Sequence, residues 1–251
     1  MGEPYWTDGQ VSLYLGDFRD VLPDLHIEAD LVLTDPPYGE TSLDWDVWPA
    51  GWPALMTPYA SSMWCFGSMR MFLERRDEFR DWRLSQDVVW EKHRRSGLAT
   101  DRFARIHEHA LHWYRGDWGA IRHETPKVPL IGQRRATARR GAIEPGTRDA
   151  YGASVWEDDG TRWQPTILYS RAMHRNGGIN ETEKPTGILE PLISYGCPPG
   201  GLVLDVFAGS CSSLVAARSL GRRAVGIEKR EAQCEAAAKR LSQGCLDLAG
   251  L

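Results

Sequence analysis

Hydrophobic positions along most of the chain follow either short continuous runs or helical spacing. Apolar runs that end at Gly, Asp or Pro predict strands, and apolar residues three or four positions apart predict helices. In the first half of the chain this pattern predicts strands at 11–15, 30–34, 62–66, 86–90 and 109–114, and helices at 18–25 and around 52–59.

The periodicity fails from about residue 116 to residue 178, where Gly, Pro, Arg and Asp recur and loops are expected. It returns as helix 186–194, strand 202–206, helix 213–220, strand 223–227 and helix 230–241. Strands that alternate with helices predict an α/β fold with a mainly parallel sheet.

Four carboxylates fall near the ends of predicted strands: Asp17, Asp35, Asp205 and Glu228. The carboxyl ends of parallel strands lie at one edge of a sheet, and ligands of α/β proteins bind there. The sequence therefore predicts a binding site at that edge.

Composition adds an uneven distribution of charge. The net charge is −4, yet residues 75–148 hold 17 Lys and Arg against 10 Asp and Glu. A polyanion would meet this middle segment, although a solvated surface of mixed charge is the alternative.

Other classes of protein are not favoured. The five cysteines include no Cys-x-x-Cys pair, which argues against a disulfide scaffold and a zinc module. His107 and His109 would share one face of a strand and His112 would not, so no metal is expected. Neither a membrane span nor a signal peptide is apparent, and a cytoplasmic location is expected.

The segment Asp205-Val-Phe-Ala-Gly-Ser-Cys211 predicts a strand that turns tightly into a helix. Glycine allows a ligand to approach the backbone, and the helix N-terminus lies next to it. Glu228 follows the next strand, at a spacing that suits a carboxylate holding ribose hydroxyls. A plain strand–turn–helix with a capping serine is the structural alternative.

The segment Asp35-Pro36-Pro37-Tyr38 is more specific. Two prolines fix the backbone, so that the Asp35 carboxylate and the Pro36 carbonyl face one point. These two acceptors would hold both N–H groups of the exocyclic amine of a nucleobase. Tyr38 would offer a flat ring on which that base could stack.

Together, Asp35-Pro-Pro-Tyr38 and Asp205-x-Phe-x-Gly-Ser210 resemble the amino-group DNA methyltransferases, in particular those of the N6-adenine type. The catalytic half precedes the cofactor half, which resembles the permuted β group. The resemblance implies a Rossmann-like S-adenosylmethionine-dependent methyltransferase fold, with helices on both faces of a twisted sheet. It divides the chain into a catalytic half (1–115), an irregular target-recognition insertion (116–180) and a cofactor half (181–251).

The resemblance also implies roles for individual residues. The flipped base would contact Asp35, Pro36, Pro37 and Tyr38, and Glu228 would hold the cofactor's ribose. The remaining contacts to S-adenosylmethionine would come from Asp17, Phe18, Lys184, Pro185, Asp205, Phe207, Ala208, Gly209 and Ser210. The chain departs from the family pattern at two places. Cys211 stands where the family usually has Gly, which would alter the turn. Asn180-Glu181 stands where the family usually has His-Pro, close to Lys184 and Pro185, which would lie near the methionine end of the cofactor.

Double-stranded DNA is the expected partner, with a homodimer as a further possibility from the resemblance. A target base must be flipped out of the duplex at a cost of a few kcal/mol. Phosphate contacts would compensate, with steep salt dependence. The basic residues expected to supply them are Lys92, Arg94, Arg95, Arg102, Arg105, Arg134, Arg135, Arg139 and Arg140.

Three alternatives remain open. Methylation of cytosine N4 uses the same amine chemistry, and only the resemblance, through Asp35, favours adenine. An RNA base or a protein amide is a second possible substrate. A catalytically silent nucleic-acid-binding protein on the same fold is the third, although four carboxylates beside a polyanion argue against it.

Overall fold

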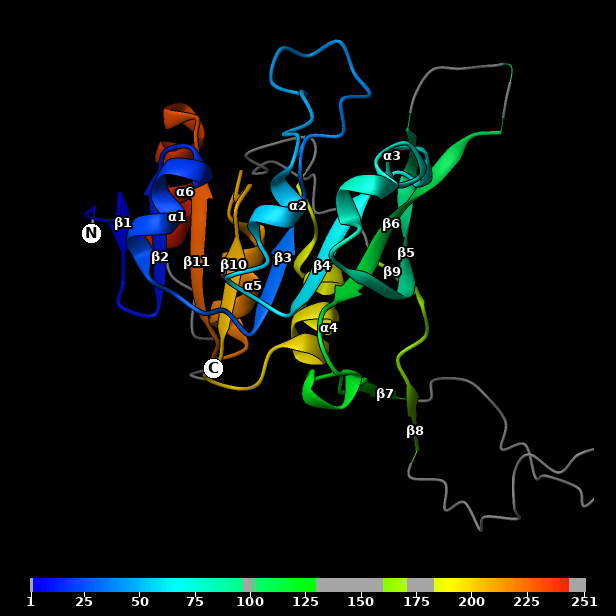
Figure 1. Ribbon diagram of the computed structural model, residues 1–251. Coiled ribbons are helices and arrows are strands. Elements are labelled where there is room, and N and C mark those ends of the chain that lie inside the picture. Colours follow the sequence, from blue (N-terminus) through cyan, green and yellow to red (C-terminus); the bar gives the residue numbers. More distant parts are fainter. Residues whose placement is uncertain (1, 97–100, 102, 130–159, 171–182, 244–251) are drawn as a thin grey trace, which may run out of the picture.

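A nine-stranded mixed sheet forms the centre of the fold (Figure 1). The computed structural model describes residues 2–96, 101, 103–129, 160–170 and 183–243, with the side chains of 93–96 left out. Across the sheet the strands lie in the order β1 (Trp6–Thr7), β2 (Val11–Leu15), β11 (Arg223–Glu228), β10 (Leu202–Asp205), β3 (Leu31–Thr34), β4 (Ser62–Gly67), β6 (Arg105–Tyr114), β5 (Arg83–Ser96) and β9 (Ile167–Tyr169). A separate antiparallel pair consists of β7 (Lys127–Pro129) and β8 (Thr161–Trp163).

The central strands of this sheet are parallel, from β2 through β11, β10 and β3 to β4. Antiparallel pairing occurs toward both edges, where β1 joins β2 and β6 joins β4 and β5. Every residue of β3, β4 and β10 is buried. Strands covered on both faces read as continuous apolar runs, which is why the sequence predicts them well.

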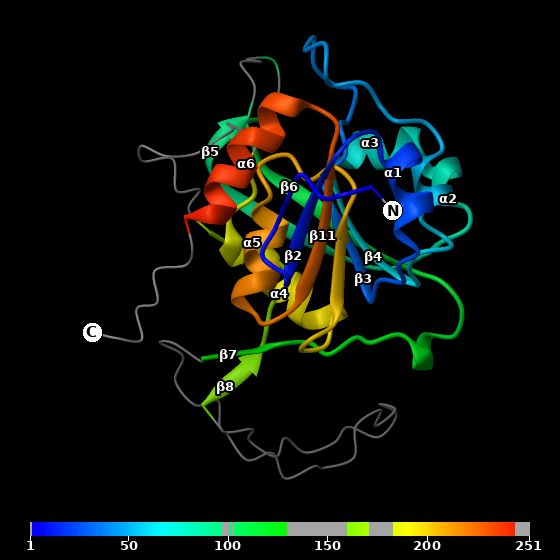
Figure 2. The same cartoon turned by 90° about the vertical axis from the view of Figure 1, so that its left-hand side faces the viewer.

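Helices cover both faces of the sheet, as Figure 2 shows. One face is covered by α1 (Phe18–Leu25), α2 (Trp52–Leu55), α3 (Met69–Glu74) and the 3-10 turn η1 (Arg76–Phe79). The other is covered by α4 (Thr186–Gly196), α5 (Ser212–Ser219) and α6 (Glu231–Ser242), and a second 3-10 turn, η2, spans Trp118–Ala120. Two apolar cores, one on each face, confirm the predicted α/β architecture.

Local chemistry sets the helix positions. Asp17 caps α1 by accepting from the Arg19 N–H at 3.0 Å, and Ser68 caps α3 by accepting from the Met71 N–H at 3.0 Å. Gly226 in β11 allows α5 to pack closely, because a Cβ there would lie 2.7 Å from the Leu214 side chain.

The order of strands brings distant parts of the chain together. Strands β2 and β3 are consecutive in that part of the sequence but not neighbours in the sheet, because β11 and β10, from the end of the chain, lie between them. Val203 of β10 therefore pairs with Leu31 of β3. At the sheet edge the Trp6 indole N–H donates to the Ser242 hydroxyl at 2.8 Å, so the first strand contacts the last helix.

Several expected boundaries are wrong. The helix expected around 52–59 ends at Leu55, because Thr57 precedes Pro58 and a residue before proline disfavours the helical region. The loop expected over 116–178 contains β7, β8 and β9, three-residue strands too short to show periodicity. The hairpin of β5 and β6 is longer than expected, and α3 was not predicted.

Candidate active site

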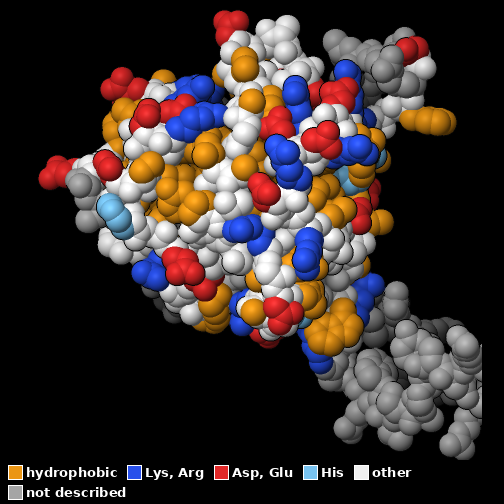
Figure 3. Space-filling view, in the orientation of Figure 1, with side chains coloured by type: hydrophobic (Ala, Val, Ile, Leu, Met, Phe, Trp, Pro, Cys, Tyr) orange, Lys and Arg blue, Asp and Glu red, His pale blue; other side chains and the backbone are white. Residues whose placement is uncertain are grey.

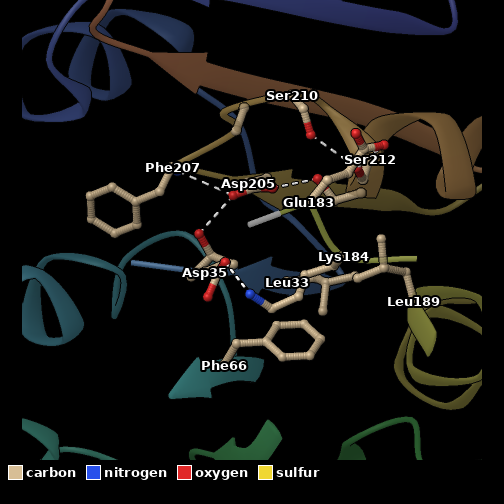
Figure 4. Close-up of a pocket in the computed structure, with 13 residues that line it drawn as sticks. Leu33, Asp35, Phe66, Glu183, Lys184, Leu189, Asp205, Phe207, Ser210 and Ser212 are labelled. Atoms are coloured by element: carbon tan, nitrogen blue, oxygen red, sulfur yellow. Dashed lines mark hydrogen bonds and ion pairs between the residues drawn. The ribbon is translucent and has the colours of Figure 1, made fainter. Parts of the chain in front are cut away.

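A cleft opens at the carboxyl ends of β3 and β10 (Figure 4). It lies where the two halves of the chain meet in the sheet. Its lining residues are Leu33, Thr34, Asp35, Phe66, Glu183, Lys184, Leu189, Asp205, Phe207, Ala208, Ser210, Ser212 and Ser213. Six of the predicted site residues, Asp35, Lys184, Asp205, Phe207, Ala208 and Ser210, are therefore brought together.

Asp35 follows β3 directly, and its carboxylate is held by two donors. The Tyr38 hydroxyl donates to Asp35 Oδ1 at 2.6 Å, and the Lys184 ammonium donates to Oδ2. Burial and the negative charge of Asp35 raise the pKa of Tyr38 well above its usual value. Tyr38 is therefore a neutral donor at physiological pH. Pro36 is buried, while Pro37 and Tyr38 are partly buried.

Lys184 joins this carboxylate to a second, partly buried anion, Glu108 of β6. Lys184 Nζ lies 3.3 Å from Glu108 Oε2, and Lys92 of β5 pairs with Oε1 of the same carboxylate. Burial opposes the charge of Lys184, but Asp35 and Glu108 outweigh it and raise the Lys184 pKa. Burial also opposes the charge of Glu108, but Lys184 and Lys92 lower its pKa to about 2. Lys184 and Glu108 are therefore both charged at neutral pH.

Sequence reasoning missed Glu108 as a site residue. The available signal was the antiparallel pairing of β5 and β6, in which Trp90 lies opposite Glu108. Lys92 is two residues further along β5, within diagonal reach of Glu108. A Glu and a Lys placed diagonally on two paired strands therefore predict an ion pair once the pairing is known.

Asp205, at the end of β10, is the most enclosed carboxylate of the cleft, with 5% of its surface exposed. It accepts hydrogen bonds from the Thr34 hydroxyl at 2.6 Å, the Phe207 N–H at 3.1 Å and the Ser213 hydroxyl. Burial outweighs these hydrogen bonds and raises the pKa of Asp205 to about 6. The carboxylate ties β3 to β10 across 171 residues of sequence.

This shift predicts a dependence of stability on pH. Because the folded-state pKa of Asp205 is raised, its contribution to stability is full below about pH 4 and is lost as pH rises through about 6. The free energy of unfolding of the wild type minus that of Asp205→Asn should fall by about 2 kcal/mol between pH 4 and pH 7. Urea unfolding at each pH measures this difference, and a constant difference would contradict the assignment.

The turn after Asp205 is held from two sides. Gly209, at φ +48°, donates its N–H to Glu228 Oε2 at 3.0 Å. Arg240 of α6 donates to the Ser210 carbonyl and the Ser212 hydroxyl, each at 3.2 Å, and also pairs with Glu183. The loop is thus fixed before any ligand binds.

Cys211 closes this turn in a left-handed conformation, at φ +59°. Its N–H donates to the Ala208 carbonyl at 2.6 Å, and its side chain is fully buried. The cysteine therefore adopts the backbone conformation that favours glycine, at a cost of about 1 kcal/mol.

Cys211→Gly and Cys211→Ala test this strain. Both remove the buried sulfur, but only glycine relieves the backbone, so Cys211→Gly should be about 1 kcal/mol more stable than Cys211→Ala. Urea unfolding of the two variants gives the order. A more stable alanine variant would show that the turn is not strained.

Glu228, at the end of β11, is buried and already bonded on both oxygens. Oε1 accepts from the Arg230 N–H at 2.9 Å and from Arg230 Nε at 3.1 Å. The Arg230 guanidinium also lies 5.3 Å from the centre of the Trp45 ring. Glu228 thereby joins the turn at Gly209 to the loop that follows Asp35.

That loop is organised by Asp46, a buried carboxylate. It accepts from the backbone N–H groups of Gly39, Glu40 and Thr41 at 2.7–3.0 Å and from the Thr41 hydroxyl at 2.7 Å. These bonds outweigh burial and lower the pKa of Asp46. The loop keeps Leu43 and Val47 exposed beside the site.

Asp17, Phe18 and Pro185 lie outside the residues that line the cleft. Asp17 caps α1, and Pro185 precedes α4. Phe18 is buried, with its ring centre 5.2 Å from that of Phe207 in an edge-to-face contact. Their contacts with a cofactor stay predictions. Of the three tryptophans after the motif, Trp48 and Trp52 belong to the core, and Trp45 is exposed.

The basic residues expected to meet DNA are described only in part. Lys92 points into the ion pair with Glu108, while Arg105 is exposed and lies 3.7 Å from Glu40. The side chains of Arg94 and Arg95, and residues Arg102, Arg134, Arg135, Arg139 and Arg140, lie outside the described parts of the chain. Figure 3 shows Lys and Arg side chains, mixed with acidic ones, over the upper half of one face.

His112 is a core histidine. Its ring nitrogens are hydrogen-bonded to Ser62 at 3.0 Å and Ser85 at 2.6 Å, and burial lowers its pKa to about 4. Within the described ranges, no group of three or more His, Cys, Asp or Glu is placed to hold a metal ion. Among the same residues, no helix has the length and apolar character needed to cross a membrane.

Comparison with known proteins places this chain in a family. The family model N6_N4_Mtase, described as DNA methylase, matches residues 29–239. The type II methyltransferase M2.LlaDCHI of Lactococcus lactis subsp. cremoris is 37% identical over 67 residues, which are 27% of this chain and 25% of that protein. The matches cover about a quarter of the length of the curated relatives.

Two solved structures share the fold. The M1.HpyAVI–SAM complex has a TM-score of 0.63 at 21% identity, over 92% of this chain and 99% of that one. The PvuII DNA methyltransferase, which is cytosine-N4-specific, has a TM-score of 0.63 at 15% identity, over 98% and 90%. These likenesses confirm the expected Rossmann-like methyltransferase fold. Because the family model spans most of the sequence, this chain belongs to the DNA methylase family of N6 and N4 methyltransferases.

Proposed function

We propose that this protein is an S-adenosylmethionine-dependent DNA methyltransferase that modifies N6 of a flipped-out adenine. The observation that carries the proposal is the position of Asp35, in a cleft shared with the Asp205 turn and at the boundary between β3 and β10. A carboxylate that can hold an amine thus lies beside a turn that can hold a nucleoside cofactor.

The residues of the cleft fit S-adenosylmethionine. Asp205 and Glu183 are anionic partners for its cationic groups, and Lys184 is a cationic partner for its carboxylate. Phe207 offers an aromatic ring, and Glu228 beside Gly209 offers a carboxylate for ribose hydroxyls. When bound, S-adenosylmethionine supplies an electrophilic methyl group.

The chain's own residues prepare the amine. The Asp35 carboxylate and the Pro36 carbonyl accept its two N–H groups and draw the nitrogen toward a tetrahedral, nucleophilic shape. Tyr38 presents a ring for stacking the base, a contact worth about 1–3 kcal/mol in comparable sites. The partly buried position of Tyr38, anchored through its hydroxyl to Asp35, supports this role.

Double-stranded DNA would approach the edge of the sheet where the Asp46 loop exposes Leu43 and Val47. Arg105 and other basic residues of segment 75–148 supply phosphate contacts. Residues 116–180 select the target sequence. The catalytic half (1–115) and the cofactor half (181–251) follow the permuted β-group order.

Cytosine N4 is the second candidate target. The fold match to the cytosine-N4-specific PvuII enzyme is as high as the match to M1.HpyAVI, and the amine chemistry is the same. Asp35 favours adenine through the motif alone.

Nucleoside analysis distinguishes these functions. The protein is incubated with unmethylated genomic DNA and methyl-labelled S-adenosylmethionine, and the nucleosides are separated by mass spectrometry. Labelled N6-methyladenine is expected, and sequencing then gives the target site. Labelled N4-methylcytosine would mean that the target is cytosine and that the amine chemistry is unchanged. Cofactor binding without any labelled DNA nucleoside would overturn the proposal in favour of an RNA substrate or a silent binder.

A further inference from the structure

Asp35 has no oxygen free of an internal donor. Tyr38 occupies Oδ1 and Lys184 occupies Oδ2. An ammonium on Oδ2 takes the position of an N–H donor, which is what a target amine would bring. Oδ2 can accept a second hydrogen bond, but there the neutral amine competes with the charged ammonium until Lys184 releases it.

Lys184 can release Asp35 without becoming an uncompensated buried charge. Its side chain is 8% exposed, so loss of every anionic partner would be costly. Glu108, 3.3 Å away, remains as a second partner, and Lys92 holds Glu108 in place. Glu108 is therefore an anchor about which the Lys184 ammonium can move.

The cleft also supplies a reason for Lys184 to move. Among the described residues that line it, Lys184 is the only Lys or Arg, whereas Asp35, Glu183 and Asp205 are acidic. Arg240, a cation beside the lining residues Glu183 and Ser210, is already engaged by Glu183 and the Ser210 turn. A ligand carboxylate entering this cleft thus has Lys184 as its cationic partner.

We propose that Lys184 is a positioning residue that couples cofactor binding to base capture: a cofactor carboxylate draws its ammonium away from Asp35 and frees Oδ2 for the target amine. This inference rests on the proposed function. Because binding free energies are linked, the base must strengthen cofactor binding by the same factor. Cofactor and DNA then bind with positive cooperativity through one ammonium group.

The test measures binding without methyl transfer. A duplex keeps adenine, with its N6 amine, at the target position identified by sequencing, and carries 2-aminopurine as the neighbouring base, whose fluorescence reports base capture. S-Adenosylhomocysteine retains the amino-acid carboxylate, whereas 5′-methylthioadenosine retains the nucleoside and lacks it. In the wild type, saturating S-adenosylhomocysteine should lower the Kd for the duplex about 10-fold, within the usual range of coupling, and methylthioadenosine should leave it unchanged.

Lys184→Met should abolish this coupling, with a Kd ratio close to 1. Lys239→Met is the matched control, because Lys239 is an exposed lysine paired with Glu235 on α6, and it should keep the wild-type ratio. Wild-type coupling in Lys184→Met would overturn the inference. Equal effects of the two ligands on the wild type would overturn it as well, and this comparison needs no variant to fold.

Failure of the proposed function has a different signature. If the wild type labels no DNA nucleoside, the methyltransferase proposal itself fails. If the wild type methylates DNA and the ligand or variant comparison shows no carboxylate-dependent coupling, only the role of Lys184 fails.

Discussion

Asp35→Ala is expected to lower the rate of methyl transfer by about 1,000-fold or more, while the Kd for S-adenosylmethionine changes only a few-fold. Loss of a group that acts on the reacting atoms commonly costs 10²–10⁴-fold in rate. The cofactor turn is held independently by Glu228 and Arg240, so the substitution leaves it in place. Single-turnover transfer at saturating cofactor gives the rate, and calorimetry gives the Kd.

Two further variants sharpen this prediction. Asp35→Asn keeps one oxygen acceptor and loses the charge, so its rate should lie between those of Asp35→Ala and the wild type. Asp44→Ala removes an exposed carboxylate from the following loop and should behave as wild type. Parallel loss of rate and cofactor affinity in Asp35→Ala would mean that this carboxylate serves the cofactor instead.

Glu228→Ala should have the opposite effect and chiefly weaken cofactor binding, by about 100-fold. Hydrogen bonds to a charged group contribute about 1.5–3 kcal/mol each, and the variant also loses the bond that fixes the Gly209 N–H. The rate at saturating cofactor should stay within a few-fold of wild type, because Asp35 is unchanged.

Glu231→Ala is the control for this variant. Glu231 is an exposed carboxylate three residues further along, in the first turn of α6, and its removal should leave the Kd unchanged. Calorimetric titration of both variants decides the matter. If Glu228→Ala binds the cofactor as tightly as wild type, the ribose assignment is wrong.

The elements that frame the site could be predicted because their sequences obey strong local rules. The fully buried strands β3 and β10 appear as apolar runs; Asp35 directly follows the first, and Asp205 ends the second. The pairing of β3 with β10 could not be derived from periodicity, since register between strands far apart in sequence leaves no local pattern. That juxtaposition was implied by the resemblance of the two motifs to one family.

The interactions of Lys184 were beyond sequence reasoning for the same reason. Its partners come from three other elements, Asp35 after β3, Glu108 on β6 and, through Glu108, Lys92 on β5. The resemblance implied a contact with the cofactor, and the geometry adds the ion pair with Asp35. Short elements such as β9 were missed because their three residues gain stability from the neighbouring strand, not from their own pattern.

The contact between Trp6 and Ser242 has an evolutionary consequence. The first strand and the last helix touch, while the two halves of the site are connected along the chain only through the segment between β6 and α4. A gene rearrangement that fused the ends and reopened that segment would keep every strand neighbour of the central sheet. The order of the two halves along the chain is therefore not dictated by the strand pairing that builds the site.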